Sequence, residues 1–280
     1  MAHRTLVAAE QLLAHLADPD WIVFDCRHDL ARPDWGEQEY RRAHVPGARF
    51  LHLDRDLSGP MNGRNGRHPL PDAGVLAAKL GKAGVAAEKQ VIAYDSQGGM
   101  CAARLWWLLR WLGHEAAAVL DGGWSGWIAE SRPQSTVIPE PENSVFGAAP
   151  GQTWVGADYV LSHLEDPGTL LLDARSPDRF RGENETLDAV GGRIPGALNR
   201  NWRDNLDANG RFKSPQVLQP EILAIIGDSR PQEIVHLCGS GVSACHNLLA
   251  MEIAGMGGGR LYPGSWSEWC AAPSRPIARG

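Results

Sequence analysis

The 280-residue sequence lacks several features that mark particular classes of protein. No apolar run approaches the roughly 18 residues of a membrane span, and the N-terminal segment has no basic stretch followed by an apolar core and a cleavage site. Positive charge is not in excess either, because 27 Lys and Arg stand against 33 Asp and Glu, a net charge of −6. We therefore expect no membrane partner and no nucleic-acid partner, since both select basic surfaces.

Cysteine is also scarce. The chain has five cysteines, and an odd number in a chain of this length does not favour a disulfide framework. Their spacing is not typical of a zinc site, so we predict no metal and no cofactor. Free thiols are typical of a reducing compartment, which predicts a cytoplasmic location.

The sequence contains an internal repeat. Residues 6–27 and 154–175 align without a gap at an offset of 148 residues, with identical residues at nine of 22 positions. The match continues from HVPGA at 44–48 to RIPGA at 193–197, and it closes with GGWSGW and GSWSEW. A repeat of this length exceeds a solenoid unit and indicates two copies of one domain.

The two copies are separated by a segment rich in Pro, Ser and small residues, which predicts domains at 1–135 and 151–280 with a linker at 136–150. Within each copy, short apolar strands alternate with amphipathic helices. This order predicts the α/β class, with a small parallel β-sheet flanked by helices in each domain. The expected strands are 21–25, 91–94, 169–173 and 234–237, and the expected helices are 8–16, 73–80, 102–112, 157–164, 220–226 and 243–254.

The stretch IVHLCGSGVSACHNLLAMEIAG, residues 234–255, predicts a strand, a loop and a helix. Cys238 falls where the strand turns into the loop, the place where open α/β sheets bind ligands. A thiol there faces the backbone N–H groups of Gly239 to Ser243 and a helix N-terminus, and both favour negative charge. We therefore predict an activated thiolate at Cys238. Its counterpart in the first copy is Asp95.

Several motifs together resemble the two-domain rhodanese-type sulfurtransferases over essentially the whole chain. They are the strands VFDCR and LLDAR, the two PGA elements, the CGSGVSAC loop and the closures DGGWSGW and PGSWSEW. The resemblance implies two tandem rhodanese-like domains. It also implies that the second domain is catalytic and that the first, with Asp95 in place of the cysteine, is not.

The resemblance implies that Cys238 takes sulfur from a small anionic donor and carries it as a persulfide. The acceptor would be cyanide, a small thiol or a protein thiol, such as that of a thioredoxin-like protein. The loop CGSGV is most similar to that of the family members that use 3-mercaptopyruvate, which favours this donor. Thiosulfate is the alternative.

The resemblance also implies a relay of Ser240, His68 and Asp54 that handles protons on the donor. An acid that orients an imidazole beside a reacting group is a reasonable proton shuttle. Asp56 competes with Asp54, because the separation between Asp54 and His68 is longer here than in the mercaptopyruvate enzymes.

Arg179 matches the family arginine that grips the anionic group of the donor, and its planar guanidinium suits a carboxylate. The second arginine expected further along is missing, because residues 183–190 read ENETLDAV. Arg193 is a candidate substitute. Trp35 matches a tryptophan that packs against the active loop. The loop residues expected to contact the donor are Gly239, Gly241, Val242 and Ser243.

Two other functions compete with sulfur transfer. A cysteine phosphatase would carry an arginine six residues after the cysteine, but that position is Ala244 and the loop has no arginine to pair with a phosphate ester. A non-catalytic binding or sensor module is the second alternative, and Asp95 illustrates such a loss in the first copy. The cysteine retained at Cys238 argues against it for the second.

Overall fold

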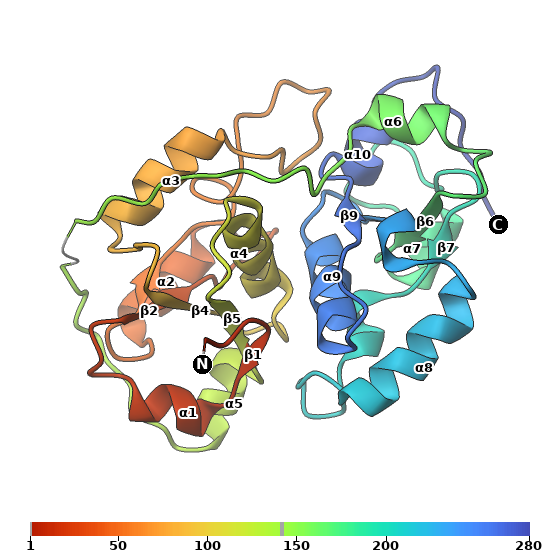
Figure 1. The fold of residues 1–280 in the computed structure, drawn as a ribbon. Coiled ribbons are helices and arrows are strands. Elements are labelled where there is room, and N and C mark those ends of the chain that lie inside the picture. Colours follow the sequence, from red (N-terminus) through yellow and green to blue (C-terminus); the bar gives the residue numbers. More distant parts are fainter. Residues whose placement is uncertain (1, 141–142) are drawn as a thin grey trace. The chain divides into compact units, whose positions relative to one another are not determined.

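The computed structural model describes residues 2–140 and 143–280, and the chain forms two compact units (Figure 1). Unit 1 comprises Met1–Gly59, Pro71–Gly151 and Asp207–Phe212, and unit 2 comprises Pro60–Leu70, Gln152–Leu206 and Lys213–Gly280. Each unit thus contains most of one repeat and a short segment from the other half of the sequence. The segment that joins unit 2, Pro60–Leu70, carries His68.

The sheet of unit 1 contains five parallel strands within the described residues, in the order β1-β5-β4-β2-β3. All five residues of β4 are buried, as expected for a central strand of a parallel sheet that is covered on both faces. The strands are β1 (Leu6–Val7), β2 (Trp21–Asp25), β3 (Arg49–Phe50), β4 (Gln90–Tyr94) and β5 (Ala117–Leu120).

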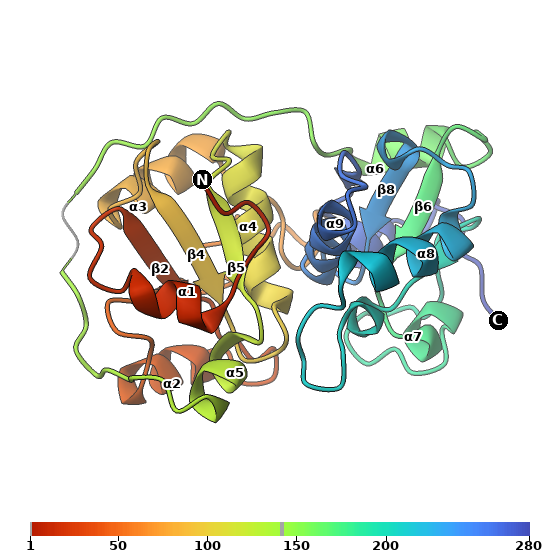
Figure 2. The ribbon, with the colours of Figure 1, turned by 60° about the horizontal axis from the view of Figure 1, so that its bottom comes forward.

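Helices cover both faces of this sheet. Leu12 and Trp127 pack with Ile92 of β4 in one buried cluster, so the first and last helices of the unit cover the same face. Figure 2 shows α1 on one side of the strands and α3 and α4 on the other. The helices are α1 (Ala9–Ala14), α2 (Trp35–Arg42), α3 (Ala73–Lys82), α4 (Met100–Trp111) and α5 (Gly123–Ala129).

Unit 2 repeats this plan with four parallel strands within the described residues, in the order β7-β6-β8-β9. The strands are β6 (Leu170–Asp173), β7 (Leu198–Asn199), β8 (Ile234–Leu237) and β9 (Arg260–Leu261). Its helices are α6 (Ala157–Ser162), α7 (Pro177–Arg181), α8 (Pro215–Ile226), α9 (Ser243–Ile253) and α10 (Ser265–Trp269), with short 3₁₀ helices η1 (Trp202–Asn205) and η2 (Pro231–Glu233). Helices α6 and α10 pack on one face, and α9 packs against β8 and α8.

The prediction of the α/β class with small parallel sheets flanked by helices is confirmed. Several elements differ from the expected ones: α1 and α6 are shorter, the short strands at the edges of the sheets were not predicted, and α8 begins at Pro215 and not at Pro220. Pro215 occupies the first turn, where proline costs no helical hydrogen bond, and the helix continues through Pro220. Burial of Leu218, Ile222 and Ile226 on one side of the helix compensates for the hydrogen bond lost at Pro220.

The duplication is visible at the level of single side chains. Arg27 donates to Asp25 at 2.6 Å and lies over the ring of Trp124, and the corresponding Arg175 donates to Asp173 at 2.7 Å. Both pairs are almost fully buried, and in each the arginine backbone N–H also donates to the aspartate. Charges buried this deeply need partners with good geometry. Each Asp-x-Arg motif therefore fixes the chain where a central strand ends.

No helix among residues 2–140 and 143–280 is long and apolar enough to cross a membrane.

Candidate active site

The loop from Cys238 to Val242 joins the carboxyl end of β8 to the first residue of α9. Gly241 has φ +76°, and a Cβ at this position would collide with the carbonyl group of Pro263. Only glycine fits both requirements. The sequence of the loop is therefore constrained by its close approach to the chain just before α10.

Cys238 is almost fully buried, and its Sγ atom accepts a hydrogen bond from the N–H of Gly241 at 3.1 Å. The backbone N–H of Cys238 donates to Oγ of Ser265 at 3.0 Å. The carbonyl oxygen of Cys238 accepts from the N–H of Trp266, and that of Gly239 accepts from Ser267. These hydrogen bonds fix both carbonyl groups at the start of α10. The N–H group that the structure places on the thiol is that of Gly241.

The matching loop of unit 1 carries an anion at the corresponding position. The carboxylate of Asp95 accepts four backbone hydrogen bonds of 2.7–3.0 Å, and it is buried. The donors are the N–H groups of Gln97, Gly99, Cys101 and Ala102. A loop of this geometry followed by a helix N-terminus therefore binds a negative group within this same chain.

The other cysteines have environments that do not favour a reactive thiolate. Burial raises the pKa of Cys26 and of Cys101 well above the usual value, and it raises the pKa of Cys270 to about 11. Thiols with raised pKa values stay protonated and are poor nucleophiles at neutral pH. Cys245 is fully buried on α9, where its thiol donates to the carbonyl oxygen of Gly241.

Ser240 and His68 are brought together in unit 2. Nδ1 of His68 lies 2.7 Å from Oγ of Ser240, and both residues are buried. Ser240 stands two residues beyond Cys238 in the same loop. Segment Pro60–Leu70 brings the histidine there, and the N–H of Arg67 in this segment donates to Ser267 Oγ at 3.1 Å.

Arg179 lies at the loop as well. Its Nη1 and Nη2 atoms are 3.6 and 3.4 Å from the position that a Cβ on Gly239 would take. Its guanidinium is held on the other side by Glu185, with hydrogen bonds of 2.8–3.1 Å. Burial opposes ionisation of Glu185, but hydrogen bonds from the N–H of Leu187 and from Arg179 lower its pKa below the usual range. Glu185 is thus a fixed counter-ion that orients Arg179.

Arg193 and Trp35 occupy other surroundings. Nη1 of Arg193 donates to the carbonyl oxygen of Gly280 at 2.5 Å, and its guanidinium lies over the ring of Phe180. These contacts tie Arg193 to α7 and to the C-terminal residue Gly280. Trp35 begins α2 in unit 1, half-buried, beneath the guanidinium of Arg32.

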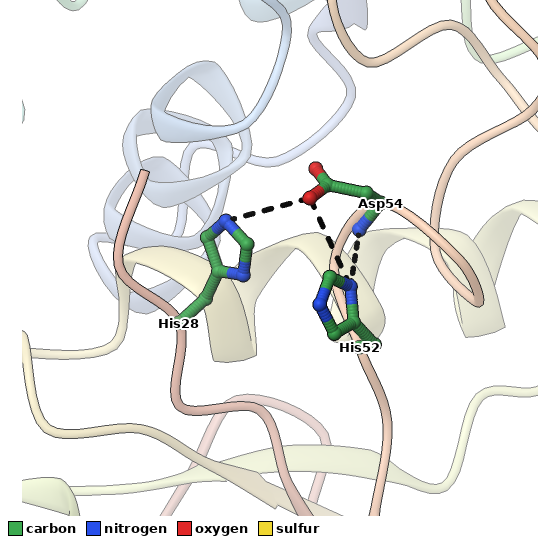
Figure 3. A group of neighbouring side chains, drawn as sticks. All are labelled: His28, His52 and Asp54. Atoms are coloured by element: carbon green, nitrogen blue, oxygen red, sulfur yellow. Dashed lines mark hydrogen bonds and ion pairs between the residues drawn. The ribbon is translucent and has the colours of Figure 1, made fainter. Parts of the chain in front are cut away.

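Asp54 lies in unit 1 within a cluster of three potential metal ligands (Figure 3). Its Oδ2 atom is 3.9 Å from Nε2 of His28 and 3.9 Å from Nδ1 of His52. Nε2 of His52 lies 3.1 Å from the carbonyl oxygen of Pro33 and must donate, so Nδ1 is the unprotonated nitrogen. That nitrogen already accepts the N–H of Asp54 at 3.1 Å. A metal would have to displace this hydrogen bond, so the cluster does not fit a metal site.

Asp56, the competitor of Asp54, is bound within unit 1. Its Oδ2 accepts the N–H of His52 at 2.7 Å, and its Oδ1 accepts Nζ of Lys79 at 2.5 Å. With both oxygens engaged in structural contacts, Asp56 is the less suitable acid for a relay.

The structure adds two residues that the sequence analysis did not single out. Ser265 anchors the N–H of Cys238 and donates to the carbonyl oxygen of Tyr262, and it adopts φ +53°, which is rare outside glycine. Arg67 lies with its Nη2 atom 2.9 Å from the position of a Cβ on Gly239. In the sequence, Arg67 could have been identified from its position directly before His68.

Comparisons with known proteins identify the family of the chain. The model of the rhodanese-like domain matches twice, at residues 8–130 and 156–272. A Pseudomonas aeruginosa protein described as "Probable 3-mercaptopyruvate sulfurtransferase" is 44% identical over the full length of both chains. The thiosulfate sulfurtransferase of Rattus norvegicus is 31% identical, covering 99% of this chain and 96% of the relative. The 3-mercaptopyruvate sulfurtransferase from Leishmania major superposes with a TM-score of 0.86 at 29% identity, covering 98% of this chain and 76% of that one.

The resemblance inferred from the motifs is thereby confirmed, because two domain matches account for most of the sequence and each falls on one copy of the repeat. The chain belongs to the rhodanese-like family and carries two tandem rhodanese-like domains.

Proposed function

We propose that this protein is a sulfurtransferase that moves sulfur from 3-mercaptopyruvate, through a persulfide on Cys238, to a thiol or to cyanide. The observation that carries this proposal is the hydrogen bond of 2.7 Å between His68 and Ser240, two residues from the thiol. Transfer from mercaptopyruvate requires a proton for the carbon that loses sulfur, and a histidine paired with a hydroxyl can supply it. The named relatives support the same reaction class.

In the first half-reaction, the Cys238 thiolate attacks the sulfur of 3-mercaptopyruvate. An S–S bond forms and the C–S bond breaks, and the electron pair of the broken bond remains on carbon as the enolate of pyruvate. The proton that the cysteine gave up returns to this carbon through Ser240 and His68. The products are pyruvate and a Cys238 persulfide that retains the donor's thiol hydrogen.

In the second half-reaction, a thiolate attacks the outer sulfur of the persulfide. The S–S bond breaks, its electron pair returns to Cys238 as the thiolate, and the acceptor leaves as a persulfide of its own. With cyanide as the acceptor, the product is thiocyanate. A thioredoxin-like protein is the protein acceptor that we propose.

The remaining residues have proposed roles in the same reaction. Arg179 binds the donor carboxylate, and the loop residues Gly239, Gly241, Val242 and Ser243 supply backbone groups around the sulfur. Asp54 is our candidate for the acid of the relay, since Asp56 is engaged by Lys79 and by the N–H of His52. Trp35 keeps the packing role that the family resemblance implies.

Thiosulfate is the alternative donor, because a thiosulfate sulfurtransferase is among the relatives. Sulfite leaves thiosulfate as a stable anion, so that reaction does not need the proton. Paired measurements of kcat/KM with both donors and one acceptor distinguish them. A higher value for mercaptopyruvate is expected, and a higher value for thiosulfate would overturn the donor assignment.

The enzymatic proposal is tested by mass spectrometry. Donor should add the mass of one sulfur to the peptide that contains Cys238, and Cys238→Ser should abolish turnover. Sulfur found on a different cysteine would refute this assignment. Turnover retained in Cys238→Ser would refute it as well, and no turnover with either donor would favour the non-catalytic module.

We place the protein in the cytoplasm, where its five free cysteines would stay reduced.

A further inference from the structure

Unit 1 contains a pocket of about 440 Å³ that is lined only by its own residues, and none of these has a role in the proposed reaction. The pocket lies among α2, β3, the C-terminal end of α3 and residues 138–139. Its volume is in the range of small-molecule sites, which is about 300–1,000 Å³. We propose that it binds an organic anion in which a carboxylate is carried on a flat apolar body.

The lining of the pocket has an excess of positive charge. Four cationic and two acidic side chains line it. Two of the cations, Arg41 and Lys79, are paired with the two acids at 2.7 and 2.5 Å. The other two, Arg49 and Lys82, have no ion-pair partner among the described residues. Although the whole chain has a net charge of −6, this pocket thus offers two cations to a ligand.

Arg49 is half-buried in the wall of the pocket and has hydrogen-bond donors left over. Its Nη1 donates to the carbonyl oxygen of Ala83 at 2.6 Å, and its Nε is buried without a hydrogen-bond partner among the described residues. Burial lowers the pKa of this guanidinium from its ordinary value. A cation that is partly removed from water without a counter-ion destabilises the fold, and an anion in the pocket would supply the missing partner.

The rest of the pocket provides apolar surface. The rings of Tyr40 and Phe50 lie 5.5 Å apart at an angle of 31°. The hydroxyl of Tyr40 donates to the carbonyl oxygen of Ala48 at 2.8 Å, so Tyr40 offers its ring to a ligand. Ile138 adds a side chain that is 54% exposed. An inorganic anion at Arg49 would leave this surface in water, whereas a flat apolar body would cover it.

The wall formed by Ile138 and Pro139 is fixed to the same unit. Nε2 of His44, a fully buried residue, lies 3.0 Å from the carbonyl oxygen of Val137. The backbone of His44 also exchanges two hydrogen bonds of 2.9 Å with that of Ser135. The segment that leaves α5 is therefore bound to unit 1 beside the pocket.

The first test compares 2-naphthoate with 2-naphthamide, which share a flat apolar body but differ in charge. Titration calorimetry measures the binding of each probe to the full chain. 2-Naphthoate should bind roughly tenfold or more tightly than 2-naphthamide, as expected for one charge-assisted hydrogen bond. Equal affinities, or no binding of 2-naphthoate, would overturn the proposal.

Two variants locate the binding site. Arg49→Gln should weaken the binding of 2-naphthoate roughly tenfold and change that of 2-naphthamide by less than about twofold. Lys82→Gln should also weaken 2-naphthoate binding, and this exposed residue decides the test if Arg49→Gln does not fold. Arg42→Gln is the matched control, because Arg42 lies on α2, pairs with Glu39 and does not line the pocket. Wild-type affinity in both pocket variants would overturn the proposal.

The proposed active site also attracts anions, so Arg179→Gln distinguishes the two sites. Arg179 belongs to unit 2, and its substitution should leave the affinity for 2-naphthoate unchanged. Loss of binding in Arg179→Gln together with wild-type affinity in Arg49→Gln would assign the probe to the active site and overturn the proposal. Because no measurement here involves sulfur transfer, failure of the proposed function leaves these tests intact.

Discussion

The imidazole of His68 is hydrogen-bonded to the hydroxyl of Ser240 at 2.7 Å, although 172 residues separate them in the sequence. Both belong to unit 2, because segment Pro60–Leu70 of the first half packs in that unit. The first half of the sequence, which has Asp95 at the position that matches Cys238, thus contributes this segment to unit 2. Ser240 lies two residues from Cys238, and this pair is the source of the proton in the reaction that we propose.

We predict that His68→Asn lowers kcat/KM for mercaptopyruvate roughly 100-fold and affects thiosulfate turnover much less, because only the first reaction leaves an enolate. Paired steady-state assays with both donors measure this ratio. His3→Asn is the control, because His3 is distant from His68 in the sequence and takes no part in the hydrogen bond between His68 and Ser240. Equal losses with both donors would remove His68 from proton transfer.

We predict that Asp95→Asn destabilises unit 1 by roughly 2–4 kcal/mol, as judged from the strength of charged hydrogen bonds. Each oxygen of Asp95 accepts two backbone N–H groups, so the NH₂ group of an amide would face two donors in place of one acceptor oxygen. Urea-induced unfolding measures the change, with the exposed Asp20→Asn as the control. If Asp95→Asn and the control lower the free energy of unfolding equally, the stability of the loop does not depend on the carboxylate of Asp95.

Much of this architecture could be predicted from the sequence, because the signals are local. Strand β8 and the loop after it were predicted from an apolar β-branched run followed by glycines, and β2 from a similar run at 21–25. Helix α8 was predicted too short, since a proline at position 220 resembles a helix start. Local patterns do not show whether distant packing compensates for a lost hydrogen bond.

The arrangement of the site was less predictable. Cys238 could be chosen from its place at a strand end, and His68 only from the resemblance. The contacts of Arg67 with Asp188 and Gly239 depend on a surface loop that joins the other half of the chain, and no periodicity reports such a contact. Ser265 was missed for the same reason, because its role rests on hydrogen bonds to the backbone of Cys238 and of Tyr262.

We predict that Ser265→Ala lowers the free energy of unfolding by roughly 1–3 kcal/mol, because it leaves the buried N–H of Cys238 and the carbonyl of Tyr262 without this hydroxyl. It should also lower kcat, since the loop that carries the thiol loses an anchor. Urea titration and single-turnover persulfide formation report the two effects. The exposed Ser162→Ala serves as control, and wild-type values for Ser265→Ala would contradict the anchoring role.

The burial of His236 in β8 predicts how the free energy of unfolding depends on pH. The residue is fully buried, and neither ring nitrogen has a hydrogen-bond partner within the described residues. Burial lowers its pKa to about 3, whereas an unfolded chain protonates histidine near its ordinary value of 6.5. The folded state thus keeps the ring neutral while the unfolded state takes up a proton. The stability that this residue contributes is complete above pH 6.5 and is lost as the pH falls from 6.5 towards 3.

Replacing this histidine by leucine should therefore remove part of the acid sensitivity. We expect the difference in unfolding free energy between His236→Leu and wild type to shift in favour of the variant by up to about 1.4 kcal/mol per pH unit below 6.5. Urea titrations at several pH values, followed by tryptophan fluorescence, measure this slope, and His3→Leu is the control on a partly exposed ring. A difference that stays constant with pH would mean that the folded protein protonates His236 as readily as the unfolded chain does.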